Sequence, residues 1–409
     1  MSSPVHKRLE LVDALRAFAL FGILQVNIQS FVWGAGDPLG YFLVRPRDVD
    51  VLTWFVLDTW VVSKFMTLFA LLLGFGMALQ WRAIKRASVG GDPLQAAHQA
   101  LRRRYRFLLL LGVAHGTLLY FGDILTAYAL CALVALRYLP VRPARLLRAA
   151  RNWGWVYALM TLGVMGYAIE VHRYLGAEAT DHLLPPEAVQ AFTTYVSAPY
   201  MGQLAQRFQD YRQVTTGTVL LASPLIVALF LLGALAARQG WLHHPERHPR
   251  VWRVALWVGL GGWVLGAVGA GLNTRTMVYS PGNPDPTGAL LLAFSACTTA
   301  LYLALIVRWR NSAWLRATIT WLAPAGRMPL TNYLLQSVLM GALLSGWGLS
   351  LGLQMTQTSR ASTAVFFALS QVLISRVWIA RFGVGPVEAL WRWVTYGPLK
   401  MRSNSLATH

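Results

Sequence analysis

The stretch 215–237, TTGTVLLASPLIVALFLLGALAA, contains no charged residue and is followed at once by Arg238. A helix rises about 1.5 Å per residue, so a run of this length crosses the roughly 30 Å hydrocarbon core of a bilayer. Pro224 predicts a kink within it, because proline removes a backbone hydrogen-bond donor. Similar apolar runs recur along the chain of 409 residues. We therefore predict an all-α fold, a polytopic membrane helical bundle of about ten transmembrane helices with short interfacial helices.

The predicted spans all have lengths suited to a bilayer, and the third and fourth form a tight hairpin that turns at Gly122-Asp123. In chain order the spans are 11–33, 52–81, 104–121, 123–139, 153–172, 215–237, 252–272, 287–307, 330–352 and 362–380. The second span is longer than a bilayer requires, so we expect it to tilt or to extend beyond the membrane.

The loops between these spans alternate between many and few basic residues. Of the 36 Lys and Arg, 27 fall on one side, 7 on the other, and 2 (Arg16 and Lys64) lie inside spans. This is the positive-inside pattern, and it predicts that both termini are cytoplasmic. The net charge of +20 then reflects topology and attraction to anionic lipids. We expect membrane lipids as partners and no nucleic acid.

We predict a single transmembrane domain over 1–409, with a cytoplasmic tail at 381–409 and an extracytoplasmic segment at 173–214 between helices five and six. In that segment, Pro185-Pro186-Glu187 predicts a helix start. A second helix is predicted to lie on the outer surface or to roof a cavity. Its apolar face comprises Tyr200, Met201, Leu204, Phe208 and Tyr211, and its polar face Gln203, Gln206, Arg207 and Asp210.

Ionisable residues within spans cost at least about 2.5–3.5 kcal/mol each at a helix centre, so each needs a partner or a function. Span two contains Asp58 and Lys64, span three contains His115, and Asp123 follows at the hairpin. At about 1.5 Å per residue, Lys64 and His115 lie at or beyond the midplane, toward the outer side. We predict that these four side chains converge on one polar pocket open to the extracytoplasmic side.

His115 is the candidate general base, because a neutral imidazole accepts a proton and a nearby carboxylate orients it. The alternative is an imidazole that only links two helices by hydrogen bonds. Asp123 would orient His115, or else it would cap the N-terminus of span four. Both alternatives stay open at the level of the sequence.

A second polar group lies toward the cytoplasmic side. Arg16 is expected to pair with Asp13, three residues earlier. With Arg16, the predicted binding residues for a nucleotide-like anion are Arg327, Asn332, Tyr333 and Glu388. The alternative is that the basic residues only set topology and anchor helices. No pattern of metal ligands is present in the sequence, and we expect no metal.

Several motifs resemble those of the YeiB-like family of bacterial inner-membrane proteins, whose shared domain has no known function. They are Lys64-Phe-Met-Thr-Leu-Phe-Ala-Leu-Leu-Leu-Gly74, His115-Gly116, Gly122-Asp123-Ile124-Leu125, Gly326-Arg327-Met328-Pro329-Leu330-Thr331-Asn332-Tyr333, Gly385-Pro386-Val387-Glu388 and, near the start, Asp13-Ala-Leu-Arg16. The resemblance covers nearly the whole chain and implies a multi-pass protein of the bacterial inner (plasma) membrane. It also implies a distant relation to transmembrane acyltransferases, which use cytoplasmic acyl-CoA and an acceptor across the membrane.

The resemblance to acyltransferases is incomplete in one respect. In lysosomal heparan N-acetyltransferase, one of these acyltransferases, the reactive histidine lies in the first extracytoplasmic loop, whereas residues 34–51 of this chain contain no histidine. The role of His115 therefore rests on its depth in the membrane.

The leading hypothesis is an acyltransferase in which acyl-CoA is the donor and the acceptor is an envelope or lipid-linked group. His115 would be the base, Asp58 or Asp123 would orient it, and Lys64 would stabilise negative charge. The alternative is a transporter or flippase for a small solute or lipid that uses the same buried charges. A scaffold without activity is a third reading, and a homo-oligomer is compatible with all of them.

Overall fold

The computed structural model describes residues 4–35, 48–88, 91–175, 186–279 and 288–397, and within these ranges the chain is helical with no β-strand. The all-α prediction is confirmed. The helices in chain order are α1 (Pro4–Ser30), α2 (Asp48–Trp60), α3 (Lys64–Ala87), α4 (Pro93–Leu118), α5 (Leu125–Ala135), α6 (Pro143–Leu175), α7 (Pro186–Ser197), α8 (Tyr200–Gln239), α9 (Pro249–Tyr279), α10 (Gly288–Ala293), α11 (Ser295–Trp309), α12 (Ala313–Gly326), α13 (Pro329–Leu344), α14 (Gln357–Phe382) and α15 (Pro386–Tyr396).

Within the described ranges, five helical segments are long and apolar enough to cross a membrane: Glu10–Ser30, Asp48–Ala87, Tyr200–Gln239, Pro249–Arg275 and Gln357–Phe382. The apolar segments Leu125–Tyr138 and Ser295–Trp309 are shorter. The further spans among the ten therefore stay a prediction.

The predicted second span is interrupted. The chain turns between α2 and α3, where Ser63 has a left-handed backbone with φ of 64°. The next residue, Lys64, begins α3 and is buried. The break places two charged residues, Asp58 and Lys64, on either side of one turn. In a straight helix these two residues would lie further apart.

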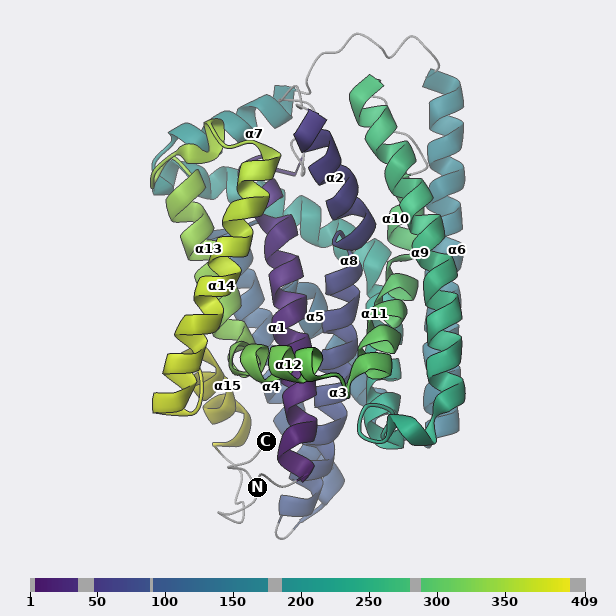
Figure 1. Ribbon diagram of the computed structural model, residues 1–409. Coiled ribbons are helices and arrows are strands. Elements are labelled where there is room, and N and C mark those ends of the chain that lie inside the picture. Colours follow the sequence, from purple (N-terminus) through teal and green to yellow (C-terminus); the bar gives the residue numbers. More distant parts are fainter. Residues whose placement is uncertain (1–3, 36–47, 89–90, 176–185, 280–287, 398–409) are drawn as a thin grey trace.

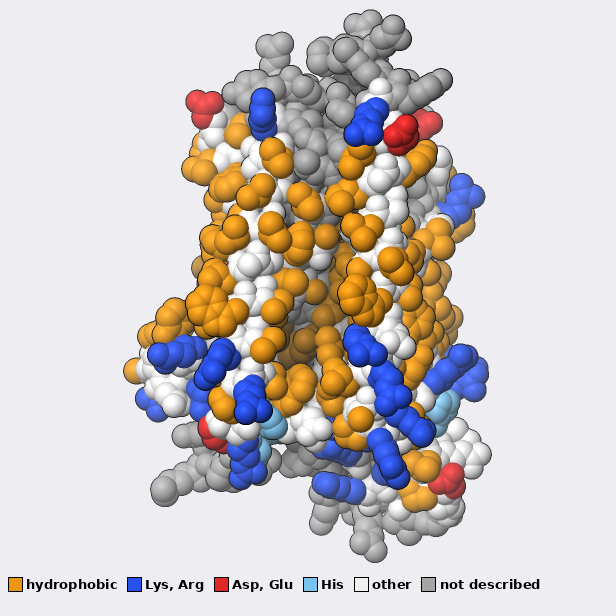
Figure 2. Space-filling view, turned by 90° about the vertical axis from the view of Figure 1, so that its right-hand side faces the viewer, with side chains coloured by type: hydrophobic (Ala, Val, Ile, Leu, Met, Phe, Trp, Pro, Cys, Tyr) orange, Lys and Arg blue, Asp and Glu red, His pale blue; other side chains and the backbone are white. Residues whose placement is uncertain are grey.

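The long axes of most helices run in the same direction, so the molecule is an elongated bundle (Figure 1). The start of α1 and helix α15 both lie at its lower end, whereas α7 lies at the upper end. Hydrophobic side chains cover the middle of the face in Figure 2, and Lys and Arg gather toward its lower part. We call this lower part the basic end. An apolar band with charge concentrated at one end is the surface that a bilayer-embedded protein presents.

The part of the apolar stretch within α8 from Leu225 onward lies inside the bundle, whereas Leu220 and Leu221 before Pro224 are 61% and 47% exposed. Its side chains from Leu225 to Leu231 are buried, with Phe230 and Leu231 fully so, and α8 packs closely on α3. The outer helices α9 and α14 are mostly exposed instead, with Trp257 65% and Val377 72% exposed. Continuous hydrophobicity thus has two causes, burial in protein for α8 and an exposed apolar face for α9 and α14.

The predicted amphipathic helix differs from the prediction in two respects. It is the first part of the 40-residue α8, which continues through Pro224 without ending. Its polar face is the inner one: Gln203, Arg207 and Asp210 are buried, whereas Met201 and Phe208 are 75% and 57% exposed. The polar side chains find protein partners inside the bundle, so this part of α8 covers one end of the bundle and does not lie free on its surface. We call this first part of α8, together with α7, the roof. The predicted helix start at Pro186 is confirmed as the first residue of α7.

Candidate active site

The candidate site forms where α4 ends and the chain turns into α5. Helix α4 finishes at Leu118, and the carbonyl of His115 accepts hydrogen bonds from the backbone N–H groups of Leu119 and Tyr120, at 2.9 and 3.0 Å. The chain then turns through Gly122 and Asp123 before α5 starts at Leu125. The predicted hairpin is therefore confirmed, and it returns Asp123 to the level of His115.

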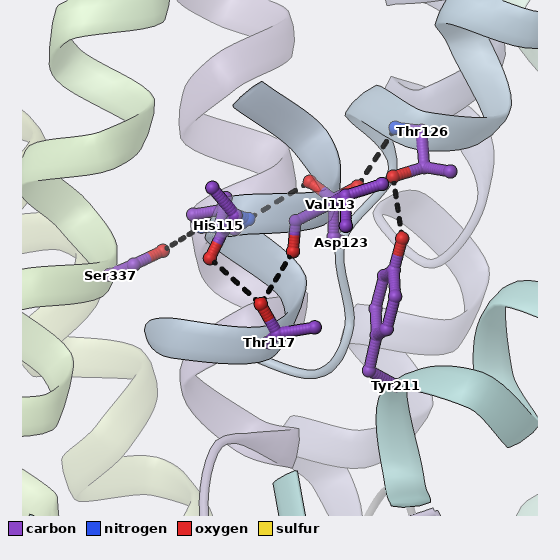
Figure 3. Close-up of polar contacts among 8 residues, drawn as sticks. Val113, His115, Thr117, Asp123, Thr126, Tyr211 and Ser337 are labelled. Atoms are coloured by element: carbon purple, nitrogen blue, oxygen red, sulfur yellow. Dashed lines mark hydrogen bonds and ion pairs between the residues drawn. The ribbon is translucent and has the colours of Figure 1, made fainter. Parts of the chain in front are cut away.

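The His115 imidazole is held on both sides by polar side chains (Figure 3). Its Nδ1 lies 2.9 Å from Asp123 Oδ1, and its Nε2 lies 2.8 Å from the hydroxyl oxygen of Ser337, which projects from α13. All three residues are buried, with 1–2% of their surface exposed. A carboxylate can only accept, so Nδ1 holds the proton. In the neutral ring Nε2 is then an acceptor, and the Ser337 hydroxyl donates to it.

Asp123 uses both of its carboxylate oxygens. While Oδ1 contacts His115, Oδ2 accepts a hydrogen bond from the backbone N–H of Thr126 at 2.8 Å, in the first turn of α5. The Thr126 hydroxyl in turn lies 3.0 Å from the hydroxyl of Tyr211 on α8. The two roles proposed for Asp123, helix cap and partner of the histidine, are both present in its contacts, since the two oxygens serve different groups.

Aromatic rings enclose the imidazole. The Tyr333 ring, also on α13, packs on His115 with centroids 4.8 Å apart, and the Tyr120 ring approaches edge-on at 6.4 Å. The Tyr120 hydroxyl is hydrogen-bonded to Ser30, whereas the buried Tyr333 hydroxyl lies near the backbone N–H of Ile124 and donates no hydrogen bond among the described residues. The site is thus apolar around the ring and polar only at its two nitrogens, which keeps water away from the hydrogen bonds.

The glycine after the histidine allows this packing. A Cβ atom on Gly116 would lie 2.2 Å from the Tyr211 ring, a distance that no real contact shows. Glycine therefore lets α8 approach α4 beside the site.

The first part of α8 holds the end of α4 in place. The Arg207 guanidinium donates to the Leu118 carbonyl at 2.8 Å, and the Tyr200 hydroxyl donates to the same oxygen at 2.9 Å. These bonds satisfy a carbonyl that the helix end leaves free. The roof is tied to the segment after α1 as well, because Asp210 accepts from the backbone N–H of Ala35 at 3.2 Å.

Tyr195 of α7 joins the roof by donating to Asp210 at 2.7 Å. Burial first, and then the Asp210 carboxylate, raises the pKa of the Tyr195 hydroxyl, so it stays protonated and keeps donating. The roof therefore closes the His115 site at the end of the bundle away from the basic end.

The other two predicted outer charges, Asp58 and Lys64, form a separate group. Asp58 accepts from the Asn273 side chain of α9 at 2.9 Å, and the Lys64 ammonium donates to the backbone carbonyl of Asp58. Thr299 of α11 donates to the Lys64 carbonyl at 2.7 Å. Within the described ranges, no hydrogen bond or ion pair joins this group to His115 or Asp123. The four predicted residues therefore form two separate pairs, His115 with Asp123 and Asp58 with Lys64.

The predicted anion-binding residues lie around the junction of α12 and α13, where most of them bind other parts of the chain. Arg16 pairs with Asp13 at 2.7 Å, as predicted. Arg327 donates to the Gly383 carbonyl at 2.9 Å, and Asn332 donates to the Ala325 carbonyl at 3.1 Å. Glu388 of α15 accepts from the backbone N–H groups of Leu330 and Thr331, at 2.6 and 3.1 Å, and so caps α13. Tyr333 lies against His115 instead.

A cavity of about 400 Å³ opens at the basic end, between the end of α3, the start of α4 and the end of α8. It is lined by four basic side chains, Arg82, Lys85, Arg86 and Arg238, together with Ala78, Trp81, Leu94, Leu139 and Pro140. Arg82 and Arg238 are partly engaged with backbone carbonyls, of Arg238 and Val141 respectively. Lys85 and Arg86 are exposed. Four cations around one cavity favour an anionic ligand such as a phosphate.

Comparison with known proteins shows which sequences this chain resembles. Residues 236–398 match the family described as "Protein of unknown function (DUF418)". The chain is 28% identical to the uncharacterized protein YxaH of Bacillus subtilis, over 96% of this chain and 95% of the relative. It is also 28% identical to the uncharacterized protein YeiB of Escherichia coli, over 94% of this chain and 95% of the relative. The chain is thus similar over nearly its whole length to YxaH and YeiB.

The resemblance predicted from the motifs is thus confirmed. The DUF418 match includes α13, which contributes Ser337 and Tyr333 to the site, but not His115 or Asp123. The alignments with YxaH and YeiB extend over nearly the whole chain, so they span both halves of the site. None of these names assigns an activity.

Ser337 is the residue of this candidate site that the sequence did not predict. It lies in an apolar helix, four residues after Tyr333, so both side chains fall on one face of α13. That spacing after the Thr331-Asn332-Tyr333 motif was the available signal. A lone serine in an apolar span is common, however, and its contact with His115 joins residues 222 positions apart.

Proposed function

We propose that this YeiB-like chain is an integral-membrane acyltransferase, with His115 as its general base. It would move an acyl group from cytoplasmic acyl-CoA to an acceptor that is extracytoplasmic or lipid-linked. The observation that supports this function best is the clamping of His115 between a carboxylate at Nδ1 and a hydroxyl at Nε2, in a buried site. A histidine oriented in this way is the usual device for deprotonating a hydroxyl or amine.

The contacts suit each residue of the site to a particular role in the proposed reaction. Asp123 keeps the proton on Nδ1 and stabilises the imidazolium that forms when Nε2 accepts a proton. The Tyr333 hydroxyl, one turn from Ser337, donates no hydrogen bond among the described residues and is the candidate donor to the oxygen that becomes negative during acyl transfer. Lys64 and Asp58 have no part in this proposal, since their contacts lie in the separate group with Asn273 and Thr299.

The cavity at the basic end supports a cytoplasmic phosphate-bearing donor. Acyl-CoA carries a pyrophosphate and a ribose phosphate, and phosphates bind clusters of Arg and Lys. We propose that Lys85 and Arg86, with Arg82 and Arg238, hold these phosphates. The membrane would be the bacterial inner membrane, with the basic end toward the cytoplasm, as the positive-inside rule requires.

Acyl-CoA turnover by the purified protein in lipid nanodiscs tests this function. Acetyl-, butyryl- and palmitoyl-CoA are each added with a bacterial lipid extract as the source of acceptor, and free CoA is measured by mass spectrometry. We expect CoA release, and a loss of about 10²–10⁴-fold in the variant His115→Ala. His248→Ala is the control, because this partly buried histidine contacts only the Gln239 carbonyl at 3.0 Å among the hydrogen bonds described.

Two results would count against the proposal. Turnover that survives His115→Ala would remove the histidine from the chemistry. A folded protein that neither binds nor cleaves any of the three donors would favour the alternative, a transporter or flippase that uses the buried Asp58 and Lys64 group.

A further inference from the structure

Many serines and threonines of the described helices donate to a carbonyl four residues earlier, whereas the hydroxyl of Ser337 bonds to a histidine of another helix. Buried hydroxyls in helices usually donate back to a carbonyl three or four residues earlier. Ser295 follows this rule by donating to the Leu292 carbonyl at 2.8 Å, and Thr395 donates to the Trp391 carbonyl. The hydrogen bond described for Ser337 is instead the one to His115, at 2.8 Å. Its hydroxyl is therefore directed out of its own helix and toward a base.

Ser337, His115 and Asp123 thus form a complete hydrogen-bonded chain. The serine hydroxyl donates to Nε2, and Nδ1–H donates to the carboxylate. A serine is a weak nucleophile by itself and becomes a strong one when an adjacent base, held by a third group, can take its proton. The three residues come from α13, α4 and the turn before α5. The roof bonds to the end of α4 through Arg207, to α5 through Tyr211, and to the segment after α13 through the Tyr195 carbonyl, which accepts from Gly346.

We propose that Ser337 is the covalent nucleophile of this site and carries the acyl group from donor to acceptor. The inference rests on the acyl transfer proposed above and deepens it: the reaction proceeds in two half-reactions through an acyl-serine ester.

The first half-reaction consumes the acyl thioester. The Ser337 oxygen attacks the thioester carbonyl carbon while its proton moves to His115 Nε2. The new C–O bond replaces the C–S bond, and the departing thiolate takes the proton from His115 to become the free thiol of CoA. No electrons are gained or lost, and the products are acyl-Ser337 and CoA.

The second half-reaction restores the serine. The acceptor hydroxyl gives its proton to His115 Nε2 and attacks the ester carbonyl. The bond to the Ser337 oxygen breaks, and that oxygen takes the proton back from His115. A buried, aromatic site suits an intermediate of this kind, because excluding water slows its hydrolysis.

A covalent intermediate also fits the position of the site within the bundle. The basic cavity lies at one end, whereas the roof of α7 and the first part of α8 closes the site at the other. Donor and acceptor need not occupy the site together if the enzyme holds the acyl group between the two steps.

Trapping of the acyl group tests the inference. The protein in nanodiscs is mixed with acetyl-CoA labelled in its acetyl carbon, without acceptor, quenched in acid and digested for mass spectrometry. We expect an acetyl group on the peptide that contains Ser337, with about one CoA released per protein in a burst. Ser337→Ala should abolish the label and lower turnover by at least about 10³-fold.

Two variants control for simple damage to the fold. Ser295→Ala removes a serine that is equally buried, at 1% exposed, but donates to the Leu292 carbonyl three residues earlier, and it should label and turn over like the wild type. Ser337→Cys keeps a nucleophile at the same place and should accumulate an acetyl thioester. Thermal unfolding of all variants shows whether they are folded.

The outcomes separate this inference from the proposed function. Turnover that persists in Ser337→Ala, or label on another residue such as His115, overturns the nucleophile while leaving the acyltransferase in place. Absence of CoA release from the wild type overturns the acyltransferase, and the acyl-serine with it. Label at Ser337 that disappears in His115→Ala supports both.

Discussion

At the residue scale, a mutation can separate the roles of the two Asp123 oxygens, one of which contacts His115 while the other caps α5. In Asp123→Asn, the amide oxygen can still accept from Thr126 and cap α5, but the amide nitrogen cannot accept from His115 Nδ1. The imidazole is then driven to the tautomer with the proton on Nε2, which cannot take a proton from Ser337. We expect acyl-CoA turnover to fall by roughly 10³–10⁴-fold, with a melting temperature close to that of the wild type.

Asp123→Ala is the matched comparison, since it removes the cap as well. It should lower turnover to the same extent and also reduce the free energy of unfolding by about 1 kcal/mol. Equal turnover in Asp123→Asn and the wild type would show that the carboxylate serves only the helix.

At the element scale, α13 depends on a carboxylate from another helix. Glu388 of α15 caps its first turn, and α13 positions both Tyr333 and Ser337. Glu388→Gln removes the charge that the helix N-terminus favours and should reduce the free energy of unfolding by about 1–2 kcal/mol, as measured by thermal or denaturant unfolding in detergent. Turnover should fall too, because the cap sets the position of α13.

Glu246→Gln is the control for this change, because its side chain is exposed and its contact with Arg310 spans 3.5 Å. Such exposed pairs contribute little to stability. Equal stability of both variants would contradict a capping role for Glu388.

At the scale of the whole molecule, the basic end decides where the donor enters. Replacing Lys85 and Arg86 by Gln removes two exposed cations from the cavity. We expect the Michaelis constant for acetyl-CoA to rise about tenfold or more, equal to about 1.4 kcal/mol of binding, with kcat nearly unchanged. The effect should shrink at high salt, as screening requires.

The Michaelis constant of this double variant should be compared with that of Arg327→Gln, which tests the anion-binding site predicted from the motifs. Arg250→Gln, on an exposed residue at the start of α9, controls for loss of charge alone. A rise in the Michaelis constant with Arg327→Gln but not with the pair Lys85 and Arg86 would place the phosphates at the α12–α13 junction.

Much of this protein follows from local rules. The apolar stretch 215–237 predicted a helix, because a backbone in hydrocarbon must satisfy its own hydrogen bonds. The turn at Gly122-Asp123, the start of α7 at Pro186 and the Asp13–Arg16 pair were also predictable, since each depends on residues close in sequence. Burial of His115 and Asp123 followed from their position in apolar segments.

Other features depend on which helices become neighbours, and no local rule gives that. The polar face of α8 faces inward because partners such as the Leu118 carbonyl are there to receive it. Glu388 serves α13 rather than a ligand because α15 packs beside the first turn of that helix. Asp58 and Lys64 bond with α9 and α11 rather than with His115, because those helices pack beside α2 and α3.

The sequence by itself therefore determined the helical class, the basic end and the burial of the histidine with its aspartate. These come from the length of apolar runs and the distribution of charge, which act along the chain. Only the tertiary structure decided that His115 meets Ser337, since that hydrogen bond spans 222 residues and requires α4 and α13 to pack with both side chains facing. A chemical site made by packing becomes visible only when the helices are assembled.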